Sequence, residues 1–250
     1  MEPLPVTIEM TDVGFEYPSG RTVLDHVDFR LRTGEKIGLI GPNGSGKSTF
    51  LHMIMGLLKP TSGNIRLFGK PVSEEKDFQE YRQRIGLLFQ HADDQLFSPT
   101  VLEDVAFGPL NLGHSPAEAR AMALKTLEEL DLRGFEDRVT YRLSGGEKKL
   151  VALATVLVMA PDVLLLDEPT TGLDEATIIR ITDILSNLEI GYIIVSHEYD
   201  FLALTTREIY SIHDGRIAFD GDASKIHSHY HSHPAGGMPH RHSEHGQNTD

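Results

Sequence analysis

The feature that most constrains the fold is the glycine-rich segment Gly41-Pro42-Asn43-Gly44-Ser45-Gly46-Lys47-Ser48-Thr49. It follows an apolar run at residues 36–40 and precedes a helical run that begins near Lys47. The segment matches the pattern G-x-x-x-x-G-K-[ST], in which a strand enters a loop and the loop opens a helix. Its glycines let successive N–H groups and the helix N-terminus point towards one anion. The segment therefore predicts an α/β chain with a phosphate-binding loop, against the alternative of an ordinary glycine-rich turn.

Two side chains at the end of this loop suit a nucleoside triphosphate bound together with a metal ion. Lys47 supplies a point charge for the β- and γ-phosphate oxygens, and the Ser48 hydroxyl is placed to hold Mg²⁺. ATP and Mg²⁺ are therefore the predicted cofactors. The predicted nucleotide-binding residues of the loop are Gly41, Pro42, Asn43, Gly44, Ser45, Gly46, Lys47, Ser48 and Thr49.

A second motif places two carboxylates at the end of a strand. The apolar run at residues 163–166 predicts a buried strand, and Asp167, Glu168 and Pro169 follow it. Ligands collect at the carboxyl ends of the strands in open α/β sheets. We assign Asp167 to Mg²⁺ and Glu168 to the attacking water, because a carboxylate engaged by the metal leaves its neighbour to accept the proton. The alternative is an exposed acidic pair at a strand end.

A third motif, Leu143-Ser144-Gly145-Gly146-Glu147, precedes a nearly continuous apolar run that predicts a buried helix at residues 148–160. By itself, Ser-Gly-Gly before a helix indicates only an N-cap. Together with the two motifs above, it resembles the signature loop of ATP-binding cassette (ABC) ATPases. The resemblance implies that Ser144 and the N–H groups of Gly145 and Gly146 contact the γ-phosphate of a nucleotide bound by a second cassette. One cassette per chain then implies a dimer, most simply a homodimer.

Four further residues match this family in the same order along the chain, and the resemblance implies their roles. Tyr17 matches the aromatic residue that stacks on adenine, and Gln90 the glutamine that reports bound nucleotide to the helical subdomain. Asp174 matches the dimer-contact aspartate, and His197 the switch histidine that reaches the γ-phosphate. On position alone, Tyr17 could be a core residue, and His197 could be a loop residue whose ring is satisfied by hydrogen bonds. The predicted catalytic residues are Glu168, His197 and Gln90, and the predicted Mg²⁺ ligands are Ser48, Gln90 and Asp167.

The same resemblance implies a P-loop NTPase fold of the ABC ATPase type. Short alternating strands occupy the start, and βα alternation takes over from Lys36, which predicts a mixed sheet core with an antiparallel flank. A helical subdomain is expected at about 91–161, where Ser115-Pro116-Ala117-Glu118 forms a capping box with proline at the first helical position. The ATPase domain is predicted to span 1–226, before a flexible tail at 227–250. The other predicted strands are residues 6–10, 14–17, 27–31, 85–89, 192–195, 208–213 and 216–220.

Composition excludes several competing classes. A chain of 250 residues with 40% hydrophobic and 24% charged residues can bury one full core. No apolar run approaches the length of a membrane span, and the start lacks a signal-peptide pattern, so we expect a soluble subunit. The net charge of -14 argues against a nucleic-acid partner, and the absence of cysteine removes disulfides and thiolate metal sites.

The string Phe89-Gln90-His91-Ala92-Asp93-Asp94-Gln95-Leu96-Phe97 narrows the resemblance. It is similar to the string typical of energy-coupling-factor importers, as is the signature with Lys148 and Lys149, although Leu150 stands where arginine commonly follows. In that branch the cassettes drive a membrane coupling subunit that works with a substrate-binding membrane subunit for vitamins, cobalt or nickel. The resemblance implies a peripheral subunit at the cytoplasmic face of the cell membrane, with a coupling helix in a groove beside Gln90. The alternative for Asp93-Asp94 is a solvated loop pair.

The last residues, 227–250, are rich in histidine and poor in apolar side chains. Neutral imidazoles on a flexible chain can bind a borderline divalent ion, and this binding would weaken below about pH 6 as they protonate. A low-complexity terminus without a role and a purification remnant are the alternatives. Imidazole affinity does not separate cobalt from nickel or other metals. The candidate tail ligands are His227, His229, His231, His233, His240, His242 and His245.

These observations predict the ATP-hydrolysing subunit of an energy-coupling-factor importer for cobalt or nickel. Its expected partners are a second cassette, a membrane coupling subunit and a metal-binding membrane subunit. An importer of this type for a vitamin or other micronutrient is one alternative, and a soluble ABC ATPase acting on nucleic acid or ribosomes is another. The latter should carry two fused cassettes or a basic arm, and the sequence has neither. The third alternative is a metal buffer in which the cassette is incidental.

Overall fold

The structure is a computed structural model that describes residues 4–223. The predicted domain boundary at residue 226 and all seven candidate tail ligands, His227 to His245, lie outside the described residues. The strands are β1 (Val6–Glu16), β2 (Thr22–Arg32), β3 (Lys36–Ile40), β4 (Ser62–Leu67), β5 (Lys70–Val72), β6 (Ile85–Leu88), β7 (Val163–Asp167), β8 (Gly191–Val195), β9 (Glu208–His213) and β10 (Arg216–Asp222). The helices are α1 (Lys47–Ile54), α2 (Glu75–Tyr81), α3 (Val101–Asn111), α4 (Pro116–Glu129), α5 (Gly145–Leu157), α6 (Glu175–Asn187) and α7 (Tyr199–Thr205), with short 3-10 turns at Ala92–Asp94 and Thr140–Arg142.

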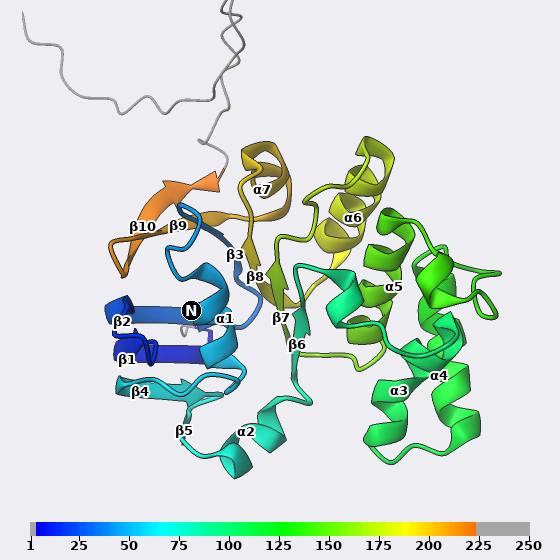
Figure 1. Cartoon of the computed structure of the whole chain (residues 1–250), viewed down its shortest axis with the longest axis horizontal. Coiled ribbons are helices and arrows are strands. Elements are labelled where there is room, and N and C mark those ends of the chain that lie inside the picture. Colours follow the sequence, from blue (N-terminus) through cyan, green and yellow to red (C-terminus); the bar gives the residue numbers. More distant parts are fainter. Residues whose placement is uncertain (1–3, 224–250) are drawn as a thin grey trace, which may run out of the picture.

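Two hydrogen-bonded sheets organise the larger part of the molecule (Figure 1). The six-stranded sheet has the order β10-β9-β3-β8-β7-β6, and every neighbouring pair is parallel except β10 with β9. The four-stranded sheet, β2-β1-β4-β5, is antiparallel throughout. Figure 1 shows α1 between the two sheets. The predicted α/β fold with an antiparallel flank is confirmed. Most of the antiparallel strands form the separate four-stranded sheet.

The central strands separate two apolar cores. On β7, Val163 and Leu165 point into the core that contains α1 and the four-stranded sheet, whereas Leu164 and Leu166 point into the core under the other helices. Side chains of a strand alternate between faces, and helices cover both faces of a parallel sheet, so β7 is buried at every residue. A strand packed on both faces is held firmly, and this fixes the position of the carboxylates at its end.

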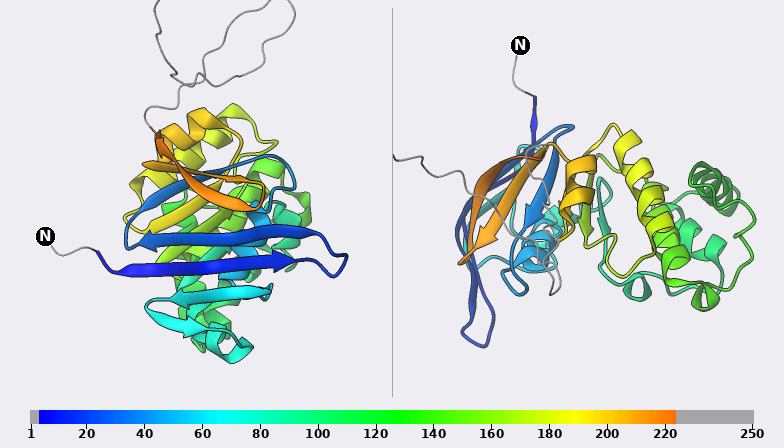
Figure 2. Two further views of the ribbon diagram at one scale, coloured as in Figure 1. Left: turned by 90° about the vertical axis from the view of Figure 1, so that its left-hand side faces the viewer. Right: turned by 90° about the horizontal axis from the view of Figure 1, so that it is seen from above.

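The helices α3, α4 and α5 lie between β6 and β7 in the chain and pack against one another. In Figure 2 they extend away from the sheets as a second lobe. The start of α4 agrees with the sequence prediction: Ser115 is the N-cap, Glu118 completes the capping box, and Pro116 is the first helical residue. Within residues 4–223, no helix combines the length and the apolar character that crossing a bilayer would require.

Some predicted element bounds are wrong. The strands expected at 6–10 and 14–17 are a single strand, β1, because a register shift beside Asp12, whose φ is 55°, carries the pairing with β2 across the interruption. The segment at residues 62–81, which no sequence pattern marked, forms β4, β5 and α2.

The helix expected at 148–160 also has different ends. It begins at Gly145, because Ser144 caps it: the Ser144 hydroxyl accepts a hydrogen bond from the Glu147 N–H, and the Glu147 carboxylate accepts one from the Ser144 N–H. Both residues of the box belong to the signature string, so the string itself starts the helix.

Candidate ATP site

The phosphate-binding loop lies between β3 and α1, where the sequence predicts it. Its last glycine, Gly46, has φ 105°, and a Cβ there would lie 2.7 Å from Val23 Cγ1. Gly41 has φ 153°, and a Cβ there would lie 2.6 Å from the carbonyl oxygen of Ile212. Only glycine fits such backbone angles and approaches, so the loop can wrap tightly at the N-terminus of α1.

Lys47 is the first residue of α1, and its side chain turns back over the loop. Its ammonium donates hydrogen bonds to the carbonyl oxygens of Gly41, at 2.8 Å, and Pro42, at 3.0 Å. Burial lowers the pKa of Lys47, while the nearby charges of Glu168 and Asp167 raise it in part. The positive charge of Lys47 is therefore held within the phosphate-binding loop, near the carboxylates of Asp167 and Glu168.

A pocket of about 260 Å³ opens over this loop. It is bounded by the ends of β1, β6 and β7 as well as by α1, so residues far apart in the sequence meet in it. The predicted site residues that line it are Tyr17, Asn43, Gly44, Gly46, Lys47, Ser48, Thr49, Gln90, Asp167 and Glu168. Pro42 and Ser45 line an adjoining pocket of about 640 Å³, together with Asn43 and Gly44.

Tyr17 lines the pocket and follows the end of β1. Its hydroxyl lies 3.0 Å from Thr49 Oγ1 on α1, and its ring packs edge-on against Phe15 with 4.9 Å between ring centroids. The residue is 37% exposed. A partly exposed ring held by two such contacts can stack on a planar base.

Asp167 is the last residue of β7, and Gln90 lies two residues beyond the end of the neighbouring strand β6. Asp167 is 6% exposed, and its Oδ1 has no hydrogen-bond partner among the described residues. The pocket that Asp167 lines also contains Ser48 and Gln90, so hydroxyl, amide and carboxylate oxygens converge there. Such oxygens are the ligands that Mg²⁺ prefers, and a buried carboxylate oxygen without a partner fits a cation.

Glu168 follows β7 with φ 46°, a left-handed conformation that is uncommon for a residue other than glycine. Its N–H donates to the carbonyl oxygen of Val195, at the end of β8. Its Oε1 lies 3.0 Å from His197 Nε2, and its Oε2 accepts a hydrogen bond of 3.0 Å from Thr171 Oγ1. The structure thus brings two of the three predicted catalytic residues, Glu168 and His197, into direct contact, which the sequence pattern does not predict.

The remaining predicted residues lie elsewhere. Ser144, Gly145 and Gly146 form the start of α5 and are absent from the pocket lining of their own chain, and Asp174 is the N-cap of α6. Ser144, Gly145 and Asp174 are exposed to solvent. The Asp174 carboxylate accepts hydrogen bonds from the N–H and hydroxyl of Thr177, and these bonds lower its pKa.

Sequence reasoning missed three residues at this site. Arg21 lines the pocket and donates to the Gly44 carbonyl oxygen at 2.9 Å, and Thr171 holds Glu168. Lys149 donates a hydrogen bond to the carbonyl oxygen of Gln90, a residue that lines the pocket. No motif marks Arg21. Thr171 and Lys149 stand beside motif residues, in the strings that contain Asp174 and the signature, and that position is the signal that could have identified them.

Taken together, the glycine loop, the carboxylate pair and the aromatic side chain in one pocket define an α/β nucleotide-binding ATPase. The family model described as "ABC transporter" matches residues 24–171, which is more than half of the chain. The chain belongs to the ABC transporter family and contains its ATPase domain.

Similar proteins cover nearly the whole chain. A putative ABC transporter ATP-binding protein of Nitratidesulfovibrio vulgaris is 48% identical over 243 residues, which cover 94% of this chain and 89% of the relative. The energy-coupling factor transporter ATP-binding protein EcfA of Methanocaldococcus jannaschii is 41% identical over 225 residues, with 88% and 81% covered.

Solved structures show the same arrangement. The structure of cbiO1 from Clostridium perfringens, described as part of the ABC transporter complex cbiONQ, is 34% identical with a TM-score of 0.80, and 88% of this chain and 90% of that chain are covered. The ATP-binding cassette MJ0796, solved as a dimer bound to ADP and Pi, is 28% identical with a TM-score of 0.79, and 86% and 98% are covered.

Proposed function

We propose that this chain is the ATP-hydrolysing subunit of an energy-coupling-factor importer, and that the cargo is a divalent transition metal, cobalt or nickel. The observation that carries the importer assignment is the similarity to EcfA over 88% of this chain, combined with a pocket that the phosphate-binding loop, Gln90 and the carboxylates of Asp167 and Glu168 line together. The metal assignment is supported by the histidines at 227–245, which lie outside the described residues.

Glu168 is the proposed general base. The water oxygen forms a bond to the γ-phosphorus, the bond from that phosphorus to the bridging oxygen of ADP breaks, and the water proton passes to the Glu168 carboxylate. His197 and Thr171 hold the two carboxylate oxygens and so direct them. Ser48, Gln90 and Asp167 would hold Mg²⁺, which supplies positive charge for the phosphate oxygens when bound.

The proposed working unit contains two cassettes. The start of α5, which contains Ser144, Gly145 and Gly146, does not line the pocket over the loop 41–49 of the same chain. Neither group alone therefore surrounds a triphosphate. A second copy would supply its own signature residues to the γ-phosphate. Hydrolysis then removes the contacts that hold the pair closed. The dimeric MJ0796 structure supports this arrangement.

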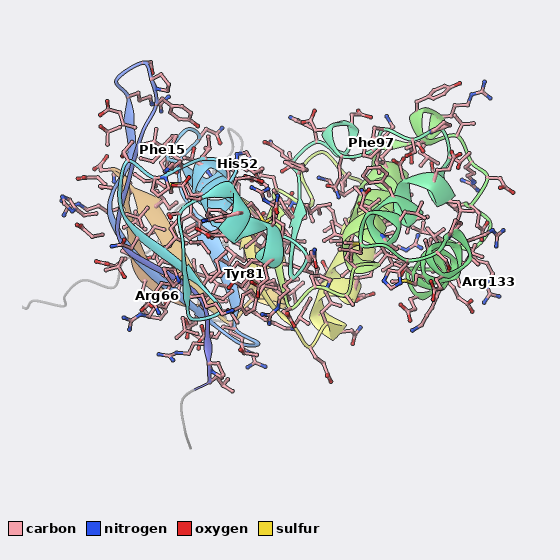
Figure 3. All side chains as sticks on the ribbon, turned by 90° about the horizontal axis from the view of Figure 1, so that it is seen from below. Phe15, His52, Arg66, Tyr81, Phe97 and Arg133 are labelled. Atoms are coloured by element: carbon pink, nitrogen blue, oxygen red, sulfur yellow. The ribbon has the colours of Figure 1, made fainter. Side chains whose placement is uncertain are left out.

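The proposed contact with a membrane coupling subunit lies on the helical lobe. A groove of about 410 Å³ with a mainly apolar lining runs along α3 and includes Leu102, Phe107 and Leu110. Phe97 packs edge-on against Phe107 at 4.7 Å between centroids, and the two residues are 66% and 44% exposed. Figure 3 labels Phe97 on this lobe. An exposed apolar surface a few residues after Gln90 fits the expected coupling helix, and would place the chain at the cytoplasmic face of the membrane.

Purification from native membranes tests the importer assignment. We expect the chain to co-purify with two integral membrane proteins, and cells lacking the chain to lose energy-dependent uptake of radiolabelled cobalt or nickel. Uptake of a vitamin instead would contradict the metal assignment alone. Recovery without any membrane protein would contradict the importer assignment and favour a soluble ABC ATPase.

Removal of residues 227–250 tests the tail separately. We expect the truncated protein to keep its basal ATPase rate, because every predicted ATP-site residue precedes residue 198, and to show reduced metal uptake at low external metal. Loss of ATPase activity and of all function would favour the metal-buffer alternative. Unchanged uptake would show that the tail has no role in metal supply.

A further inference from the structure

Lys149 is a buried lysine that none of the roles above uses. It belongs to the early part of α5 and is 3% exposed. Its ammonium donates hydrogen bonds to the carbonyl oxygens of Phe89, at 3.1 Å, and Gln90, at 2.6 Å. A side chain from α5 therefore holds the main chain of the residue whose side chain lines the nucleotide pocket.

Burial of a lysine side chain at this position is unfavourable, because its charged ammonium loses contact with water. Burial lowers the pKa of Lys149 to about 8, and the charges of Asp167 and Glu168 raise it only in part. The next residues, Leu150 and Val151, are buried apolar side chains. Within residues 4–223, Lys149 forms no ion pair, so its desolvation is offset by carbonyl oxygens and by more distant carboxylates. An apolar side chain of similar length would avoid that cost, but it would leave the carbonyl oxygens of Phe89 and Gln90 without this donor.

Two further contacts fasten the same segment to α5. Lys148, the neighbour of Lys149, forms an ion pair with Asp93. The side-chain amide of Gln95 donates to the carbonyl oxygen of Ala152, at 2.9 Å, and to Thr155 Oγ1, at 2.8 Å. Residues 89–95 are thus bound along successive turns of α5, and Lys149 provides the contact next to the pocket.

We propose that Lys149 is a positioning residue, which fixes Gln90 in the nucleotide pocket and couples that pocket to the N-terminus of α5. Gln90 shares the pocket with Asp167 and Glu168, whereas Ser144 caps the helix that contains Lys149. The second part of the proposal rests on the proposed dimer, in which the start of α5 completes the ATP site of the partner. A shift of Gln90 in one site then moves the signature residues that serve the other site.

The test substitutes methionine, which has a similar length and no donor. We expect Lys149→Met to lower kcat about tenfold or more while KM for ATP changes by less than about threefold, because positioning is lost and nucleotide binding is kept. Lys148→Met is the matched control, since it removes a neighbouring lysine whose ammonium pairs with the exposed carboxylate of Asp93 rather than with the main chain of Gln90, and it should keep a rate near that of the wild type. Lys149→Arg should recover part of the loss, because a guanidinium still donates to carbonyl oxygens.

A double-mutant cycle shows whether Lys149 acts through Gln90. We expect Gln90→Ala to lower kcat, and Lys149→Met to add little in that background, because the group that Lys149 positions is already gone. Multiplicative effects of the two substitutions, or a Lys149→Met rate equal to that of the Lys148→Met control, would overturn the proposal. If Lys149→Met does not give folded protein, Lys149→Gln is assayed by the same criteria. The double-mutant cycle is measured at one protein concentration, whereas the proposed dimer is tested by varying the protein concentration. The positioning role of Lys149 and the dimer can therefore fail independently.

Discussion

At the residue scale, Glu168 combines an uncommon backbone conformation with a carboxylate that is held at both oxygens. A left-handed conformation at a non-glycine residue costs about 1–3 kcal/mol. The bond from its N–H to Val195, 2.9 Å long, connects that conformation to β8. His197 and Thr171 then hold the side chain. The backbone turn therefore serves to direct a carboxylate, which glycine could not provide.

Glu168→Gln should separate binding from turnover. Because glutamine has nearly the same shape but cannot accept the water proton, we expect kcat to fall about a hundredfold or more while ATP affinity is kept. Steady-state hydrolysis and fluorescent-nucleotide binding measure the two quantities. Glu175→Gln, an exposed glutamate at the start of α6, is the control and should hydrolyse ATP normally. Normal turnover of Glu168→Gln would remove Glu168 from the role of base.

A second prediction at this scale concerns His26, which lies on β2 beside the register shift of β1. A hydrogen bond from the ring to Asp12 and the charges of Asp12 and Asp25 raise the pKa of His26. We expect Asp12→Asn to bring this pKa back towards its ordinary value, and asparagine tolerates the positive φ at this position. Histidine proton resonances followed against pH measure the change, with His26→Asn identifying the resonance.

The sign of the effect on stability follows from linkage. A pKa that is raised on folding stabilises the protein below the unfolded value of about 6.5, and this stabilisation disappears as pH rises through the raised value. The difference in stability between wild type and Asp12→Asn should therefore stay constant from pH 5 to about 6.5 and shrink at higher pH, as His26 loses its proton. A difference that grows with pH would contradict the assigned cause.

At the element scale, the start of α5 is packed against α6. A Cβ on Gly146 would lie 2.6 Å from Thr177 Oγ1 and 3.2 Å from its Cγ2. Thr177 is also the residue whose N–H and hydroxyl donate to Asp174. The fourth residue of the signature string, Gly146, is therefore glycine for a reason inside one chain: it leaves room for the Thr177 side chain, which holds the predicted dimer-contact aspartate.

Gly146→Ala tests this packing. We expect the free energy of unfolding to fall by about 1–3 kcal/mol, because Thr177 must move. Gly145→Ala is the matched control, since a Cβ there meets no atom of the described residues within 4 Å, and it should not destabilise the protein. Denaturant unfolding compares the variants. Adding Thr177→Ala to Gly146→Ala should recover part of the loss, and the absence of any recovery would contradict the contact.

At the scale of the whole molecule, the site residues form two groups that the fold keeps apart. One group lines the pocket at the carboxyl ends of the parallel strands, and the other begins α5 and α6. If the groups meet across a dimer, each ATP is surrounded by residues of both chains. The rate per chain should then rise with protein concentration until the dimer saturates.

Mixing two inactive variants tests shared sites directly. Lys47→Ala removes the phosphate lysine and Ser144→Arg blocks the signature, so each homodimer has two defective sites. A mixed dimer has one site with both defects and one intact site, and random exchange should restore about a quarter of the wild-type rate. A mixture no more active than its separate components would contradict a site built from two chains.

The glycine loop, the carboxylate pair and the signature N-cap were determined by the sequence alone, because each depends on residue types a few positions apart. The same is true of the capping box at Ser115. Local backbone freedom and local hydrogen bonds decide such features, so a linear pattern suffices to predict them.

Only the tertiary structure decided which of these local features meet. The contact between Glu168 and His197 depends on β7 and β8 being neighbours in register, and the contact between Lys149 and Gln90 depends on where α5 packs on the segment after β6. The joining of two predicted strands into β1 likewise depends on its pairing with β2 and β4. Such contacts come from the burial of apolar faces between elements far apart in sequence, and no local pattern contains that information.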